Sequence, residues 1–265
     1  MPERARSSAP STQPKGIRSI EIGYRVLLAV QRGPVPVQLG EIARRAGLSS
    51  GATHNYLASL VRTGLVEQEG RGSYRLGPSA FALSLASFQQ LSGYDVMRQT
   101  TKALFETTGS SVAAAVWSQA GPVSVFKLQP ERTVLYEFRT GLLPLLSAAA
   151  PRVFIAYLPA ETTLPLLEHE LAQRGRNPAD AAALRESYTA DVREKGYAVT
   201  TYVGDIGDEV AALSAPVFGA EGKIEFALSL VDFARRVHPR VGDDFLGRLL
   251  AAAREASGLL AVSRG

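Results

Sequence analysis

Apolar side chains recur every three or four positions in successive segments near the start of the chain, and this spacing predicts three short helices. The second and third helices are joined by Gly47-Leu48-Ser49, a turn of the length found in helix-turn-helix motifs. Ser49 or Ser50 is suited to cap the third helix, and Gly64 is suited to end it. Two strand-like runs then flank Glu69-Gly-Arg-Gly72 and predict a β-hairpin. Three helices followed by a hairpin are typical of a winged helix-turn-helix.

The third helix is the candidate recognition helix, because the tight turn leaves its outward side free to enter a DNA major groove. Ser and Asn side chains can bond phosphates or base edges, and Asn suits adenine. An arginine at the hairpin tip can reach a phosphate or the minor groove. The alternative is a structural helical subdomain, since helix pairs joined by a glycine turn also occur in plain bundles. The candidate DNA-binding residues are Ser49, Ser50, Gly51, Thr53, His54, Asn55, Arg62 and Arg71.

The segment from Ser79 to Leu91 carries no charged residue and places Phe81, Leu85 and Phe88 on one helical stripe. A helix that is apolar all round must be covered on more than one side. We therefore expect residues 79–95 to form a linker helix covered by a second copy of the chain, in a homodimer or homotetramer. The alternative is a core helix of the domain that follows.

The remaining body, residues 96–265, mixes helical and strand-like patterns and predicts an α+β domain. Its first two strands are joined by Gln119-Ala-Gly-Pro122, which is too short for a helical crossover, so they pair antiparallel. The expected strands are Val112–Trp117, Val123–Leu128, Val134–Phe138, Tyr197–Val203, Val210–Phe218 and Ile224–Val231. The expected helices are Met97–Thr108, Ser147–Leu158, Leu164–Gln173, Pro178–Lys195 and Arg240–Ser257.

Charge is unevenly distributed along the chain, whose net charge is +4. Residues 1–77 hold 11 Lys and Arg against 5 Asp and Glu, a net of +6, so the remainder carries −2. Residues 1–16 are rich in Ser, Pro and Arg and predict a flexible basic arm ahead of the winged helix-turn-helix at residues 17–78. A basic head on a slightly acidic body favours a double-stranded DNA partner; the alternative is a solvated basic surface.

Several classes of protein are disfavoured by what the sequence lacks. It has no cysteine, and its three histidines are widely separated, so we expect no metal site and no cofactor. No nucleophile–base pair or carboxylate pair stands out, which argues against an enzyme with an appended helical head. No stretch is apolar for long enough to span a bilayer, and the first residues lack the apolar core of a secretory signal. We therefore expect a soluble cytoplasmic protein with no membrane partner.

The block "GEIARRAGLSSGATHNYLASLVRTGLVEQEGRGSYRLG" resembles the winged helix of IclR-type bacterial transcriptional regulators. Three later segments follow in the order of that family: "TGLLPLLSAAAPRVFIAYLP", "VREKGYAV" and "AALSAPVFGAEGKIEFALSLV". The resemblance covers about residues 19–260. It implies a repressor or activator of a catabolic operon, with repressor favoured. It also implies a GAF-like effector domain with an antiparallel sheet that binds a small molecule, often an organic or aromatic acid.

The chain departs from the family pattern in both sites that the resemblance implies. Ser50-Gly51-Ala52 stands where the family usually has Lys-Ser-Thr, and Asn55 stands where it often has Arg, so two phosphate-binding cations are missing. The basic arm (Arg4, Arg6, Lys15, Arg18) is a candidate replacement. In the effector site, polar family residues are replaced by apolar ones. The implied effector-binding residues are Leu143, Leu146, Ala149, Ala150, Thr200, Val210, Ala212, Ser229 and Val231.

An apolar site leaves no buried donor unpaired against an apolar ligand, so we expect a rather apolar effector, such as an aromatic ring with one polar end. A carboxylate there would suit the backbone amides where the helix at Ser147 begins. Two alternatives remain at this point: these residues only fill the core, or the protein is a dimeric DNA-binding protein that senses no ligand and whose body is fully packed.

Overall fold

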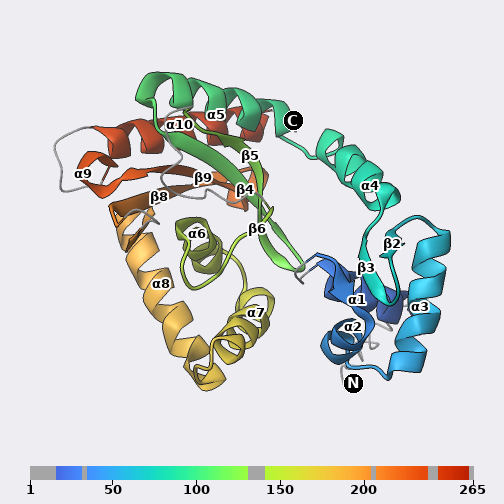
Figure 1. Cartoon of the computed structure of the whole chain (residues 1–265). Coiled ribbons are helices and arrows are strands. Elements are labelled where there is room, and N and C mark those ends of the chain that lie inside the picture. Colours follow the sequence, from blue (N-terminus) through green and yellow to red (C-terminus); the bar gives the residue numbers. More distant parts are fainter. Residues whose placement is uncertain (1–15, 32–34, 131–140, 204–206, 238–243, 263–265) are drawn as a thin grey trace, which may run out of the picture. The chain divides into compact units, whose positions relative to one another are not determined.

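The N-terminal unit, Met1–Gln90, contains three packed helices, a small sheet and a fourth helix (Figure 1). The computed structural model describes residues 16–31, 35–130, 141–203, 207–237 and 244–262. The elements of this unit are α1 (Arg18–Gln31), β1 (Val37–Gln38), α2 (Leu39–Ala46), α3 (Ser50–Arg62), β2 (Val66–Glu69), β3 (Ser73–Leu76) and α4 (Pro78–Gln89).

The helix-turn-helix depends on a left-handed residue at Gly47, with φ 64° and ψ 42°. This conformation lets the amides of Gly47 and Leu48 bond back to the carbonyls that end α2, with Leu48 N lying 3.0 Å from Ala43 O. A residue with a Cβ is strained there, whereas glycine is not. The chain therefore turns within three residues and starts α3, where the Ser49 hydroxyl accepts a bond from Ala52 N at 3.3 Å.

One apolar cluster holds these elements together. It draws Val26 and Val30 from α1, Ile42 from α2, Leu57 from α3 and Tyr74 from β3, all at most 2% exposed. The sheet order is β1-β3-β2 with antiparallel pairing throughout, and the hairpin is the wing. The winged helix-turn-helix prediction is confirmed. The short strand β1 was not predicted, because two residues carry no readable period.

The helix α4 has no buried side chain in the chain as described. Its Phe81 is 73% exposed, Leu83 62% and Leu85 52%. Isolated apolar residues on a surface are ordinary, but an uncharged helix with exposed apolar side chains on several sides is not.

The C-terminal unit, Leu91–Gly265, is built around a six-stranded antiparallel sheet with the order β6-β5-β4-β9-β8-β7. Its strands are β4 (Ser111–Ser118), β5 (Gly121–Leu128), β6 (Gly141–Leu142), β7 (Ala198–Val203), β8 (Glu209–Phe218) and β9 (Ile224–Phe233). Its helices are α5 (Tyr94–Thr108), α6 (Ala149–Tyr157), α7 (Ala160–Gln173), η1 (Pro178–Asp180), α8 (Ala181–Lys195), η2 (Ala220–Gly222), α9 (Ala234–Val237) and α10 (Phe245–Val262).

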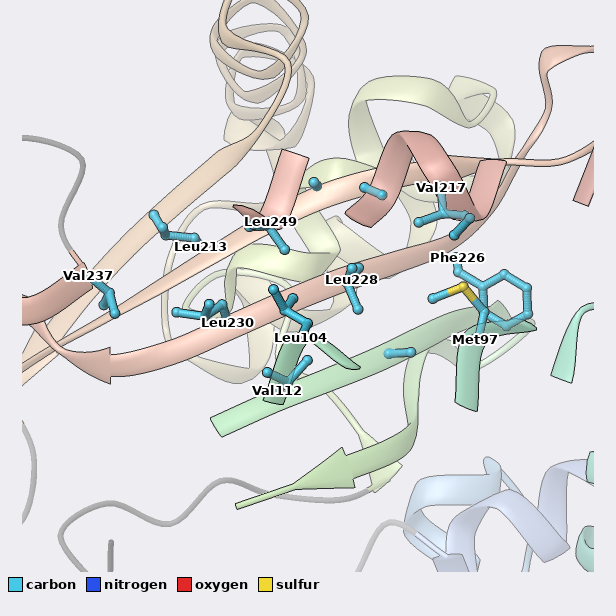
Figure 2. Close-up of a cluster of buried hydrophobic side chains, with 14 of the residues drawn as sticks. Met97, Leu104, Val112, Leu213, Val217, Phe226, Leu228, Leu230, Val237 and Leu249 are labelled. Atoms are coloured by element: carbon cyan, nitrogen blue, oxygen red, sulfur yellow. The ribbon is translucent and has the colours of Figure 1, made fainter. Parts of the chain in front are cut away.

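Helices cover both faces of this sheet, with α5 and α10 side by side on one face and α6 on the other (Figure 1). Between the sheet and the α5–α10 layer lies the largest core cluster. Figure 2 shows Met97 and Leu104 of α5 with Leu228 and Leu230 of β9 and Leu249 of α10 in that layer. On the opposite face, Val153 and Phe154 of α6 pack against the sheet. Each strand therefore divides its side chains between two cores by the alternation of its pleat.

The α+β class with an antiparallel effector-type sheet is confirmed. The link Gln119–Pro122 joins antiparallel β4 and β5, as expected from its length. The helix expected from Ser147 begins at Ala149, and the last helix runs Phe245–Val262 where Arg240–Ser257 was expected. The expected strand Val134–Phe138 and nearly all of the expected basic arm lie outside the described residues. No helix within the described segments is long and apolar enough to cross a lipid bilayer.

Candidate DNA-binding face and effector cavity

The outward side of α3 is a continuous exposed polar surface. Ser50, Gly51, His54, Asn55 and Arg62 are all exposed, at the positions that the helical spacing predicts. Ser49 is exposed too, but its hydroxyl is already engaged in capping the helix. These candidate residues therefore share one accessible helix face.

Thr53 is wrong as a candidate DNA contact. Its side chain is 0% exposed, and its hydroxyl donates to the Ser49 carbonyl oxygen at 2.9 Å. It lies one turn below the helix start on the side that faces the core, so no nucleic acid can reach it. Its role in this structure is to brace the turn that starts α3.

The wing places Arg71 at its exposed tip, between Gly70 and Gly72, which both have positive φ. Further along the hairpin, Arg75 lies 2.9 Å from Glu67 and 3.9 Å from Glu69. These residues alternate with Gln68 and Tyr74, which belong to the other face of the hairpin. The tip arginine is thus accessible, whereas Arg75 is occupied by neighbouring carboxylates.

A polar cleft of about 580 Å³ lies between α3 and the wing. It is lined by His54, Asn55, Ala58, Ser59, Val61, Arg62, Gln68 and Tyr74. Sequence reasoning found three of these residues, His54, Asn55 and Arg62. It missed three others of α3, Ala58, Ser59 and Val61, and the two from the hairpin. The period-2 alternation of the wing strands was the available signal, because it puts Gln68 and Tyr74 on one face.

A second cavity, of about 320 Å³, opens between the sheet and the start of α6. It is lined by Ala113, Ala115, Ser124, Leu143, Pro144, Ser147, Ala148, Ala149, Ala150, Thr200, Tyr202, Ala212, Ser229 and Val231. Seven of the nine expected effector-site residues are among them: Leu143, Ala149, Ala150, Thr200, Ala212, Ser229 and Val231. The effector-site candidates therefore converge on one space from four separate parts of the chain.

Two candidates lie elsewhere. Leu146 packs with Leu145 and Ile155 in the cluster that joins α6 to α7, so its side chain contributes to that core. Val210 is 0% exposed and packs against Val231, behind the lining of the cavity. Both are corrected to core positions.

Seven lining residues were not among the expected effector-site residues: Ala113 and Ala115 of β4, Ser124 of β5, Tyr202 of β7, and Pro144, Ser147 and Ala148 before α6. The register explains the two alanines: Ala113 pairs with Ser229, and Ala115 with Ala227, so they share the cavity face of the sheet. Ala113 and Ala115 on the sheet face Ala149 and Ala150 at the start of α6. Because the side chains on both sides are small, space remains between them. Strand pairing was needed to find them.

Among the described residues, the lining contains hydroxyl groups and no charged side chain. Ser229 Oγ donates to Ser214 Oγ at 3.0 Å, within a buried pair. Thr200 is 6% exposed, and its Oγ1 is buried without a hydrogen-bond partner in the described part of the chain. A buried hydroxyl left without a partner is destabilising, and a ligand oxygen or a bound water can satisfy it.

The start of α6 also faces this cavity. Its N-cap is Ala148, which supplies no side-chain hydrogen bond to the first turn. The Glu170 carboxylate of α7 fixes the approach to this helix, because it accepts from Leu145 N at 2.6 Å and Leu146 N at 3.4 Å. Arg174 holds the same carboxylate at 2.9 Å. The helix N-terminus is therefore held in place without a capping side chain of its own.

No group of three His, Cys, Asp or Glu suited to a metal ion occurs among the described residues. His54 is on the exposed face of α3, and His169 lies on α7 with Nε2 2.8 Å from Gln173 Nε2. His238 lies outside the described residues.

An exposed recognition helix with an arginine-tipped wing, on a chain whose second domain holds a cavity, is the architecture of a DNA-binding transcriptional regulator. Comparison with known protein families also identifies the chain as a transcriptional regulator. Residues 19–70 match the IclR helix-turn-helix domain, and residues 87–258 match the C-terminal domain of bacterial transcriptional regulator IclR. The chain belongs to the IclR family, and it is a regulator rather than an enzyme.

Individual relatives agree with this assignment. A probable HTH-type transcriptional regulator, ArcR of Halobacterium salinarum, is 25% identical over 96% of this chain and 97% of its own. The crystal structure of HmgR from Pseudomonas aeruginosa is 30% identical, with coverage of 92% and 98% and a TM-score of 0.53. An IclR homolog from Microbacterium hydrocarbonoxydans, solved in complex with 4-hydroxybenzoate, is 22% identical, with coverage of 91% and 98% and a TM-score of 0.62.

Proposed function

We propose that this protein is an effector-responsive repressor of a catabolic operon, acting as a homodimer or homotetramer in the cytoplasm. The observation that carries the proposal is the convergence of seven expected effector-site residues on one cavity, whose described lining residues carry no charge. A fully packed body, which a regulator without a ligand would have, has no such space. We assign Ser49, Ser50, Gly51, His54, Asn55, Arg62 and Arg71 to the DNA contact, with α3 in the major groove and the wing beside it.

The proposed effector is a single-ring aromatic acid. The cavity volume of about 320 Å³ is at the small end of ligand pockets, which span about 300–1,000 Å³. Six of its described lining residues are alanine, and Leu143, Pro144 and Val231 add further apolar surface, which suits an apolar ring. The 4-hydroxybenzoate in the Microbacterium relative supports this class of ligand.

The carboxylate of such an acid meets no cationic side chain among the described lining residues. The amides of Ala149 and Ala150 at the start of α6 are the proposed partners, because a helix N-terminus favours an anion. The Thr200 hydroxyl is the proposed partner of a further ligand oxygen, since it is buried at the cavity with no hydrogen-bond partner among the described residues.

The second copy is proposed to cover α4. This helix has no charged residue and no buried side chain, and Phe81 is 73% exposed. Two-fold dimers read palindromic DNA sites, and a helix between head and body is suited to fix the distance between two heads. Effector binding would then shift the population of dimers whose heads fit both half-sites.

The proposal is tested by gel retardation of the DNA upstream of the protein's own gene, with and without 4-hydroxybenzoate, benzoate and a polyhydroxylated aliphatic acid. We expect retardation by the protein alone and release by an aromatic acid. Retardation strengthened by the acid would contradict the repressor role as stated. A clear preference for the polyhydroxylated acid would contradict the aromatic effector, and no retardation at low salt would contradict the DNA assignment.

A variant that fills the cavity separates sensing from DNA binding. Ala212→Leu should abolish the thermal shift caused by 4-hydroxybenzoate while retardation of DNA remains, because Ala212 lines the cavity in the other domain. Ala183→Leu, the same change at an exposed position of α8, is the matched control and should respond like the unchanged protein. An unchanged ligand response in Ala212→Leu would place the effector elsewhere.

A further inference from the structure

The polar cleft between α3 and the wing has the composition of an anion site. On one wall are the α3 residues Asn55 and Arg62, and on the other are Gln68 of β2 and Tyr74 of β3. Gln68 and Tyr74 are directly opposite each other in the hairpin register, so their side chains stand together on the wall that faces α3. Hydrogen-bond donors therefore approach the cleft from both sides.

Tyr74 gives the strongest indication of a ligand. The residue is only 2% exposed, yet it lines the cleft. No hydrogen bond to its hydroxyl exists among the described residues of the chain. Buried phenols normally have a hydrogen-bond partner, and an anion in the cleft could supply one to this residue, which lines the cleft while belonging to the apolar cluster of the head.

The charges of the wing are sorted between its two faces. Glu67 and Glu69 occupy the face away from the cleft, where Arg75 pairs with both. Arg62, by contrast, has no carboxylate partner in the described structure and donates only to Ser59 Oγ, at 3.3 Å. The cleft thus has an available cation and no acidic side chain among its described lining residues.

DNA geometry explains what an anion would do there. The major and minor grooves of B-DNA are separated by a sugar–phosphate strand, so a helix in one groove and a wing in the next must straddle that strand. The cleft between α3 and the wing is the space through which the strand would pass.

We propose that this cleft binds one phosphodiester of the operator, with the Arg62 guanidinium, the Gln68 amide and the Tyr74 hydroxyl donating to its non-bridging oxygens. The inference rests on DNA binding by α3 and adds the residues that fix the register of the head on the duplex. Contacts to phosphate position a protein without reading bases, so this site acts on every DNA sequence alike.

The test uses the full-length chain and a mixed-sequence duplex of about 30 base pairs, with binding followed by fluorescence anisotropy across a salt series. Tyr74→Phe removes only the hydroxyl, and we expect affinity to fall about tenfold, as for a lost hydrogen bond to a charged group. Gln68→Glu keeps the shape and places a carboxylate against the phosphate, so its affinity should fall further. Tyr188→Phe, in the other unit, is the control for the first change.

Arg62→Gln tests the charge. We expect the slope of log affinity against log salt to decrease by about 0.9, the value for one lost phosphate contact. Arg254→Gln makes the same charge change at an exposed position of α10 and should leave the slope unchanged. Thermal unfolding of Tyr74→Phe distinguishes a role of the hydroxyl in the fold from a role in phosphate binding. If the hydroxyl serves only the phosphate, its loss should leave Tm unchanged or raise it.

Two failures are distinguishable. If the unchanged protein does not bind the duplex at low salt, DNA binding itself is contradicted. If it binds, and Tyr74→Phe and Gln68→Glu bind equally well with no change of slope in Arg62→Gln, the phosphate site is contradicted and DNA binding stands. A fall in Tm with Tyr74→Phe would also overturn the site, because the hydroxyl would then serve the fold.

Discussion

The Ser110 hydroxyl donates a 2.6 Å hydrogen bond to Asp232 Oδ2, and both residues are buried although they lie 122 positions apart in the chain. The same oxygen accepts from Arg236 at 2.6 Å, and Oδ1 accepts from Phe233 N at 2.8 Å. Asp232 thus ties the start of β4 to the end of β9, next to the cavity residue Val231. A buried carboxylate is tolerated here because each of its oxygens is bonded.

Asp232→Ala should lower the free energy of unfolding of the C-terminal unit by about 2–3 kcal/mol, because it leaves the Ser110 hydroxyl buried without a partner. The measurement is urea unfolding followed by fluorescence of Trp117. Asp191→Ala is the control: it removes the acid of a partly exposed pair with Lys195 on α8 and should change stability by about 0.5 kcal/mol or less. Equal effects of the two variants would contradict the structural role of Asp232.

Thr53→Val should leave DNA affinity unchanged and lower the stability of the head by about 0.5–1.5 kcal/mol, because it removes the bond to the Ser49 carbonyl oxygen from a fully buried site. Asn55→Ala, at an exposed position two residues later, should lower DNA affinity and leave the stability of the head unchanged. Anisotropy titrations and thermal unfolding of both variants check this pair. A loss of affinity without a loss of stability in Thr53→Val would restore Thr53 as a DNA contact.

Thr200→Val should stabilise the ligand-free protein by about 1 kcal/mol, because it removes a buried hydroxyl that has no hydrogen-bond partner among the described residues. The same change should weaken binding of an oxygen-bearing aromatic acid, since the ligand loses its bond to Oγ1. Calorimetric titration with 4-hydroxybenzoate and thermal unfolding without it measure the two effects. A destabilised apo protein would show that the hydroxyl is satisfied without the ligand.

Glu41 gives a prediction for acid pH. Hydrogen bonds from Arg44 and Arg45 lower its pKa from 4.5 to about 2. Because the pKa is lower in the folded state, the stabilising contribution is complete above the unfolded value of 4.5 and is lost as pH falls towards about 2. The difference in Tm between the unchanged protein and Glu41→Gln should therefore be constant above about pH 5 and shrink below it. A difference that grows on acidification would contradict this assignment.

Gly77→Ala should destabilise the junction between the wing and α4. A Cβ at Gly77 would overlap the Gly64 carbonyl oxygen and lie 3.1 Å from the Gly64 carbonyl carbon, and backbone atoms there cannot move aside as a side chain can. We expect a loss of about 1–3 kcal/mol, seen as faster hydrogen exchange in β2 and β3. Gly40→Ala is the control, because its Cβ meets nothing within 4 Å and alanine favours the helix α2.

The sequence by itself determined the elements and the head of this protein. Helical spacing, the glycine turn and the serine cap are local features, and they placed α2, α3 and the wing because hydrogen bonds within a few residues decide those structures. The same spacing identified the exposed face of α3. The prediction of DNA contacts failed at Thr53. Its polar side chain suggested a contact, although the helical spacing placed it on the side of α3 that faces the core.

Only the tertiary structure decided where empty space and unpaired groups remain. Sequence similarity brought Leu146 and Val210 into the effector site together with Leu143 and Val231, and nothing local distinguishes an apolar residue that lines a cavity from one that fills a core. That difference depends on which strands pair and where α6 begins. The cleft at Tyr74 likewise required the hairpin register and the packing of α3 against it. Whether a hydroxyl has a hydrogen-bond partner depends on residues that are distant in the sequence and close only in the folded chain.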